Sequence, residues 1–193
     1  VLVNAHYAVS RLVQPPPTAA PGAPVPSTPT TLPDPRSLFL GFQYNLAKLP
    51  DEPMRPRVAD ARVGYFTVSR FDYSDTRTLT PRVNLVKRWR LEKKDPAAEL
   101  SEPKPPIVFW IDRNVPLRYR DTIVAGVLEW NKAFERIGFK DAVQARIQPD
   151  DADFDTLDAR HASIRWMTTA RPVFGGIGPS QADPRTGEIL DAD

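Results

Sequence analysis

Residues 107–147 constrain the fold most strongly, because their hydrophobic pattern changes from strand to helix and back to strand. Residues 107–111 form a short, continuous apolar run, which is typical of a strand covered on both faces. Residues 143–147 alternate apolar and polar side chains, as a half-buried strand does. A strand, a helical crossover and a second strand predict a right-handed βαβ unit, and we expect residues 107–111 to be central in their sheet.

Between these two strands, apolar side chains recur at spacings of three and four residues. Pro116 suits the first turn of a helix, and Gly138 suits its C-terminal cap. The sequence therefore predicts one helix of about five to six turns over residues 116–137. The apolar positions are Ile123, Val124, Val127, Leu128, Trp130, Phe134 and Ile137.

Two further strands are predicted nearer the C-terminus. Residues 163–167 are expected to form a strand that buries Ile164 and Trp166. The sequence Asp-Pro-Arg-Thr-Gly at residues 183–187 predicts a turn, and residues 188–191 after it are expected to form an edge strand.

Proline-rich segments divide the rest of the chain. Because proline fixes φ and removes a backbone donor, the first such segment predicts an extended linker or surface loop in preference to a ligand for a proline-binding domain. A second proline cluster at residues 102–106 predicts a domain boundary. The expected organisation is a strand-like segment (1–14), the linker (15–35), a β-rich accessory region (36–102) and a further folded region (103–193).

Within the accessory region, residues 36–49 carry apolar side chains at a helix-like spacing that Gly41 interrupts. Residues 62–69 and 83–91 are rich in β-forming residues and predict strands. The fold class predicted for the chain is therefore α+β, with a β-rich N-terminal region.

Composition excludes several classes of function. The formal net charge is only +2, so strong electrostatic attraction to nucleic acid or anionic lipid is not expected. There is no cysteine, which excludes disulfides, thiolate metal sites and cysteine nucleophiles. No apolar run approaches the roughly 20 residues that cross a bilayer, so no membrane span is expected. A basic cluster around Trp89 fits an ion-paired or solvated strand face better than a nucleic-acid patch: Lys87, Arg88, Arg90, Lys93 and Lys94.

Three patterns have chemical interpretations that the sequence does not favour. Asp151, Asp153 and Asp155 have the spacing that begins a calcium loop, but Thr156 and Ala162 stand where that loop needs Gly and Glu. An acidic solvated loop is therefore preferred to a calcium site. The glycines at 175, 176 and 178 precede Pro179 instead of opening a helix, which argues against a phosphate loop, and Ser180 is not in a nucleophile elbow.

Five ordered stretches of the chain resemble bacterial zinc-dependent metalloproteases of the metzincin type, in which a domain of unknown function precedes the catalytic domain. The resemblance implies that residues 103–193 are the N-terminal half of a metzincin-like catalytic domain, a twisted mixed sheet with one long helix. It also implies a peptide or protein substrate and a secreted or periplasmic location. The stretches are residues 56–66, 88–96, 126–139, 164–166 and 178–193.

A metzincin binds Zn²⁺ through two histidines one helical turn apart, with a glutamate that activates the bound water. His6 and His161 are far apart and outside such a motif, so neither is assigned as a metal ligand and no catalytic residue is assigned. Because the chain also starts at Val1 without a signal-peptide pattern, we expect a part of a longer protein, with the zinc ligands after Asp193.

By the resemblance, the last residues would line the substrate cleft as an edge strand, and the remaining half of the catalytic domain would be a partner. This chain by itself is expected to be inactive. The alternative is a non-enzymatic binding or scaffold module of a secreted bacterial protein. The cleft candidates are Glu188, Ile189, Leu190, Asp191, Ala192 and Asp193.

Overall fold

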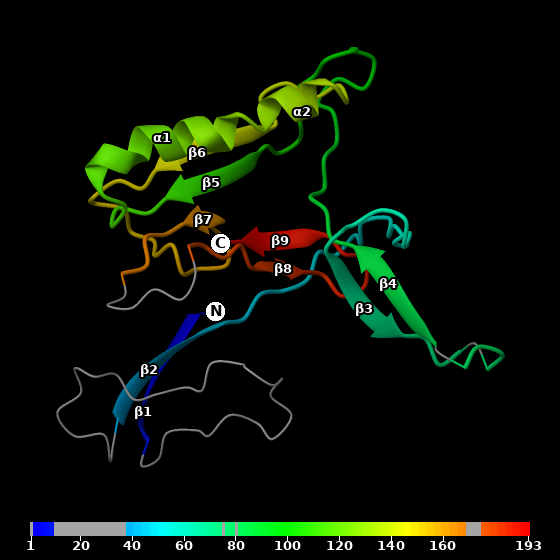
Figure 1. The fold of residues 1–193 in the computed structure, drawn as a ribbon, viewed down its shortest axis with the longest axis horizontal. Coiled ribbons are helices and arrows are strands. Elements are labelled where there is room, and N and C mark those ends of the chain that lie inside the picture. The colour runs from blue at the N-terminus through cyan, green and yellow to red at the C-terminus, as the bar shows by residue number, and fades with distance from the viewer. Residues whose placement is uncertain (1, 10–37, 75, 80, 169–174) are drawn as a thin grey trace. The chain divides into compact units, whose positions relative to one another are not determined.

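The computed structural model describes residues 2–9, 38–74, 76–79, 81–168 and 175–193, and the chain divides into two compact units, Val1–Ala47 and Lys48–Asp193 (Figure 1). The first unit is an antiparallel hairpin of β1 (Leu2–Val9) and β2 (Leu38–Asn45). The predicted N-terminal strand is therefore confirmed over β1. The proline-rich segment, residues 15–35, lies outside the described residues.

The helix suggested for residues 36–49 is wrong, because β2 occupies this segment. Phe42 and Tyr44 stand at alternate positions along β2, and their rings stack with centroids 6.4 Å apart. Apolar spacing in so short a window fits a strand as well as a helix, and Gly41 disfavours the helix. Pairing with β1 decides the outcome.

The second unit combines helices with small sheets, so the α+β class is confirmed. Its centre is a three-stranded parallel sheet in the order β6-β5-β7. β5 (Ile107–Ile111) lies in the middle, as predicted, and pairs along its whole length with β6 (Val143–Ile147). β7 (Ser163–Ile164) pairs with the end of β5 and is shorter than the predicted strand 163–167.

The predicted single helix is divided into α1 (Leu117–Leu128) and α2 (Asn131–Glu135). Between them the amide of Trp130 donates to the carbonyl of Val127, three residues back, so the helical turn tightens there. α2 ends two residues before the predicted end at Ile137, and the predicted cap at Gly138 is confirmed by a Schellman arrangement. Gly138 has a φ of 91°, its amide donates to Glu135, and the amide of Phe139 donates to Phe134.

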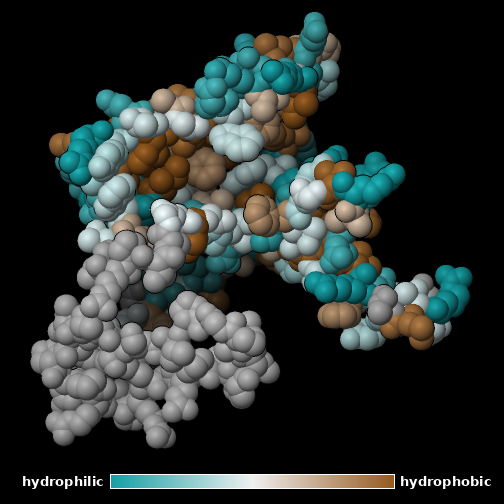
Figure 2. All heavy atoms as spheres, viewed as in Figure 1, coloured by the Kyte–Doolittle hydropathy of each residue, from teal (hydrophilic) through white to brown (hydrophobic). Residues whose placement is uncertain are grey.

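The core of this unit lies between α1 and the parallel sheet. Ile107, Val127, Ala142 and Val143 are buried together. Not every apolar position of the predicted helix is buried. Trp130, for example, is 66% exposed. Figure 2 shows brown, apolar side chains at the surface over the helical layer.

A second sheet of this unit pairs β3 (Thr67–Phe71) with β4 (Arg82–Val86) in antiparallel register. Both strands are displaced from the predicted ranges 62–69 and 83–91. Residues beyond β4 pair with other segments instead: Arg88 forms a parallel bridge with Glu188. Hydrogen bonding across the unit, which hydrophobic pattern does not reveal, sets where these strands end.

β8 (Ser180–Ala182) and β9 (Ile189–Ala192) form an antiparallel hairpin closed by the predicted turn at residues 183–187. The predicted edge strand thus exists, shifted by one residue. Trp166 was expected to be buried but is 44% exposed, and its ring stacks on Tyr119 of α1 at 5.2 Å. Residues 48–102 and 103–193 belong to one compact unit, and bridges such as Ser101 with Phe139 cross the boundary predicted between them.

Candidate functional site

The predicted cleft strand begins with a glutamate that faces inward. Glu188 is buried, with 8% of its surface exposed, and its Oε2 lies 2.7 Å from Nη2 of Arg90. Ile189 donates its amide to the carbonyl of Arg88, so the start of β9 is also fixed through its backbone. The carboxylate of Glu188 holds the strand in place instead of lining an open cleft.

The end of the same strand is tied to β7. Oδ1 of Asp193 accepts a hydrogen bond from Oγ of Ser163 at 2.6 Å, and its Oδ2 lies 3.2 Å from the guanidinium of Arg165. Asp191 is buried, and its Oδ1 has no hydrogen-bond partner among the described residues. Burial, and then the negative charge of Asp193, raise the pKa of the Asp191 carboxyl.

The turn that leads into β9 is held by Asp183. Its carboxylate accepts hydrogen bonds from the backbone and guanidinium of Arg185, and its carbonyl accepts the amides of Thr186 and Gly187. The hydrogen bonds from Arg185 lower the pKa of Asp183. The turn therefore presents β9 in one fixed position beside β8.

The side chains of the six cleft candidates therefore offer little to a substrate. Ile189, Leu190 and Ala192 are half-buried, and the two carboxylates at positions 188 and 193 are engaged within the unit. What the hairpin offers is backbone, since β8 is the only strand that pairs with β9 in a ladder within the described part of the chain. An extended peptide can be recognised by such an edge through main-chain hydrogen bonds.

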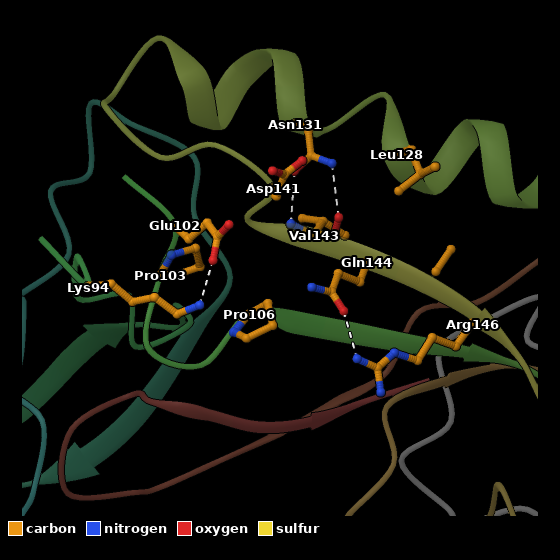
Figure 3. Close-up of a pocket in the computed structure, with 11 residues that line it drawn as sticks. Lys94, Glu102, Pro103, Pro106, Leu128, Asn131, Asp141, Val143, Gln144 and Arg146 are labelled. Atoms are coloured by element: carbon orange, nitrogen blue, oxygen red, sulfur yellow. Dashed lines mark hydrogen bonds and ion pairs between the residues drawn. The ribbon is translucent and has the colours of Figure 1, made fainter. Parts of the chain in front are cut away.

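A polar pocket of about 420 Å³ lies along β6, at the opposite edge of the parallel sheet from β7 (Figure 3). Asn131 closes part of this edge: its Nδ2 donates to the carbonyl of Val143 at 2.9 Å, and its Oδ1 accepts the amide of Val143 at 2.8 Å. The side chain thus replaces a neighbouring strand at that residue. No feature of the sequence indicated this role for Asn131.

Three of the four charged side chains of this pocket already have partners. Lys94 pairs with Glu102 at 2.5 Å, and the guanidinium of Arg146 donates to the side-chain oxygen of Gln144 at 2.8 Å. Its lining residues include no serine, threonine, cysteine or histidine, so it offers no hydroxyl or thiol nucleophile beside an imidazole base. The lining residues are Lys94, Glu102, Pro103, Pro106, Leu128, Asn131, Asp141, Val143, Gln144, Ala145 and Arg146.

The residues weighed as metal ligands are dispersed. Asp151, Asp153 and Asp155 are all exposed, and Asp155 accepts the backbone amide of Leu157. The ring of His161 stacks on Phe154, with centroids 4.2 Å apart. Within the described ranges, no three His, Asp or Glu side chains are grouped so that they could hold a metal ion.

The basic cluster around Trp89 is engaged within the unit. Its side chains donate to backbone carbonyls or pair with carboxylates, as in the bond from Lys93 to the carbonyl of Ala98 at 2.8 Å. The other four make hydrogen bonds of the same kinds: Lys87 to Ser180, Arg88 to Arg55, Arg90 to Glu188 and Lys94 to Glu102.

Comparison with known families gives one match, in which residues 22–94 are similar to a family described as Domain of unknown function (DUF5117). This stretch contains β2, β3 and β4. No curated protein and no solved structure matches the chain. None of the helices in the described part of the chain combines the length and hydrophobicity that a membrane crossing requires.

Proposed function

We propose that this chain is part of a zinc-dependent metallopeptidase and that it supplies the sheet against which a peptide substrate is held. The observation that carries the proposal is the order of elements in the second unit. A parallel β5–α1–β6 unit is followed by β7 and by the β8–β9 hairpin, and this order accompanies the sequence stretches that resemble metzincins.

Three contacts support a substrate-holding role for the hairpin. Glu188 is paired with Arg90 and Asp193 is paired with Ser163 and Arg165, so both ends of the strand are anchored. A rigid edge loses little conformational entropy when a peptide pairs with it, which favours binding. Recognition through the backbone would tolerate many side chains, as a peptidase of broad preference requires.

The chemical step would need groups that the proposal places elsewhere in the protein. Zinc would polarise the scissile carbonyl and lower the pKa of a bound water, and a glutamate would take its proton. The residues described here would orient the peptide. A secreted or periplasmic location and pairing with the remaining half of a catalytic domain belong to the same proposal.

The test compares this chain with a longer version of the same protein that extends beyond Asp193. Each is incubated with a fluorogenic peptide library with and without added Zn²⁺. We expect zinc-dependent hydrolysis by the longer protein, loss of that activity with a chelator, and no hydrolysis by this chain alone. Hydrolysis by the short chain would show that its own residues complete a site. A longer protein without any zinc-dependent activity would favour the non-enzymatic binding or scaffold module.

A further inference from the structure

Three arginines line one small pocket in the second unit, and one of them, Arg88, is bridged to the start of β9. The pocket has a volume of about 350 Å³, and its walls are Arg55, Pro56, Arg57, Val58 and Arg88. Two of the three arginines come from the segment before β3, and the third follows β4. No pattern in the sequence brings these segments together.

Hydrogen bonding brings the segments that carry the three arginines together. Val58 bridges Leu85 in antiparallel fashion, and the amide of Val86 donates to the carbonyl of Arg57 at 2.9 Å. Because side chains alternate along a strand, Arg57 and Val86 share a face of this small sheet. Arg88 lies two residues beyond Val86, and its Nη2 donates to the carbonyl oxygen of Arg55 at 2.7 Å.

No carboxylate forms an ion pair with these three arginines among the described residues. Arg55, Arg57 and Arg88 take part in none of the ion pairs found there, and the nearby carboxylate of Glu188 is bound by Arg90 at 2.7 Å. Nε of Arg88 is buried and has no hydrogen-bond partner in the part of the chain that the structure describes. Burial, and then the positive charge of Arg57, lower the pKa of Arg88.

Like charges that line one pocket repel each other unless an anion lies between them. A guanidinium presents donors in a planar fork that matches the oxygens of phosphate or sulfate. Three such groups are better balanced by a doubly charged tetrahedral anion than by one carboxylate. We propose that the pocket formed by Arg55, Arg57 and Arg88 binds a phosphate or sulfate group.

The proposal is independent of peptide hydrolysis, so its test needs no activity measurement. Inorganic phosphate is titrated into the full chain at low ionic strength, with binding followed by calorimetry, and sulfate, acetate and chloride are titrated in parallel. Comparison of phosphate with phenyl phosphate separates a free anion from the phosphate group of a larger ligand. We expect phosphate and phenyl phosphate both to bind. Acetate and chloride are expected to bind at least about tenfold more weakly than phosphate.

Arg57→Gln and Arg55→Gln test the assignment, because both side chains are exposed and their loss should leave the fold intact. Each is expected to weaken phosphate binding by about tenfold or more. Arg70→Gln is the matched control: Arg70 is exposed and pairs with Val83, on the opposite face of the same sheet from Val86. Its phosphate affinity should equal that of the wild type.

Absence of phosphate binding by the wild-type chain would overturn the proposal. So would equal affinity for acetate, or an Arg70→Gln variant that loses binding as much as Arg57→Gln does. Thermal melts of all variants confirm that a lost signal is not lost folding. If one of the two pocket variants unfolds, the phosphate affinity of the other tests the proposal.

Discussion

The carbonyl oxygen of Val86 lies 2.3 Å from the position that a Cβ atom on Gly187 would occupy. Gly187 also has a φ of 78°, in the left-handed region that residues with a side chain rarely adopt. Both restrictions act at the point where the turn of residues 183–187 meets β4. The hairpin can therefore lie this close to β4 only because position 187 has no side chain.

Gly187→Ala is expected to destabilise the protein by about 2–4 kcal/mol. The added Cβ would clash with backbone atoms, which cannot move aside as a flexible side chain can, and alanine is strained at a positive φ. Urea unfolding followed by circular dichroism measures the change. Gly126→Ala is the matched control, since Gly126 is in α1 and a Cβ there meets no atom within 4 Å among the described residues outside the neighbouring backbone of its own helix. It should stabilise the helix by about 0.5–1 kcal/mol. Equal stability of the two variants would contradict the close approach.

The sequence is informative where one period persists over a long segment or where a turn has distinctive residues. β5, β6, the end of the helical segment at Gly138 and the turn of residues 183–187 were all predicted correctly, because local pattern and tertiary contacts agree. The segment containing β2 was misassigned, since its pairing with β1 lies outside any local window. Tertiary pairing overrides a weak local preference.

Site residues are harder to predict than elements. Alternation along residues 188–193 indicates which side chains share a face, but it does not show which charged groups find partners. Glu188 was predicted to line the substrate cleft, yet it is buried and paired with Arg90, which is far away in sequence. The pocket arginines Arg55 and Arg57 were overlooked for the same reason: only the bridge from Val58 to Leu85 brings them beside Arg88.

Asn131→Ala is expected to cost about 1–2 kcal/mol of stability, because the amide and carbonyl of Val143 both lose their partner at the sheet edge. The better helix propensity of alanine offsets part of the loss. Chemical denaturation measures the change, and hydrogen exchange at Val143 should become faster. Glu135→Ala, at an exposed position of the same helix, is the control and should change stability by less than about 0.5 kcal/mol. Unchanged exchange at Val143 would show that the edge does not depend on Asn131.

Asp158→Asn tests a pH-dependent contribution to stability. The side-chain hydrogen bonds from Arg160 lower the pKa of Asp158 to about 2, below its unfolded value of about 3.9. A lowered pKa in the folded state means that the carboxylate stabilises the fold above pH about 4 and that this stability is lost as the pH falls toward about 2.

The free energy of unfolding of the wild type should therefore exceed that of the Asp158→Asn variant by a constant amount near neutral pH. This difference should shrink between pH about 4 and about 2. Urea unfolding across this range measures it. Arg160→Gln removes the main cause and should give a smaller pH dependence than the wild type. A difference that is independent of pH would show that Asp158 contributes through packing and not through charge.

Asp191→Asn should show the opposite sign. Burial and the charge of Asp193 raise the pKa of Asp191 in the folded protein, so the folded state retains its proton at a pH where the unfolded chain has lost it. Stability is then lost as the pH rises from the unfolded value of about 3.9 through the raised folded value. The asparagine has no charge to bury, so the variant should be at least as stable as the wild type at pH about 7 and should lose that advantage below pH about 4.

Asp153→Asn, in an exposed loop, is the control and should change stability by less than about 0.5 kcal/mol at either pH. An Asp191→Asn variant that is clearly less stable at neutral pH would contradict this prediction. It would show that the ionised carboxylate stabilises the fold, through a bound cation or through Arg165.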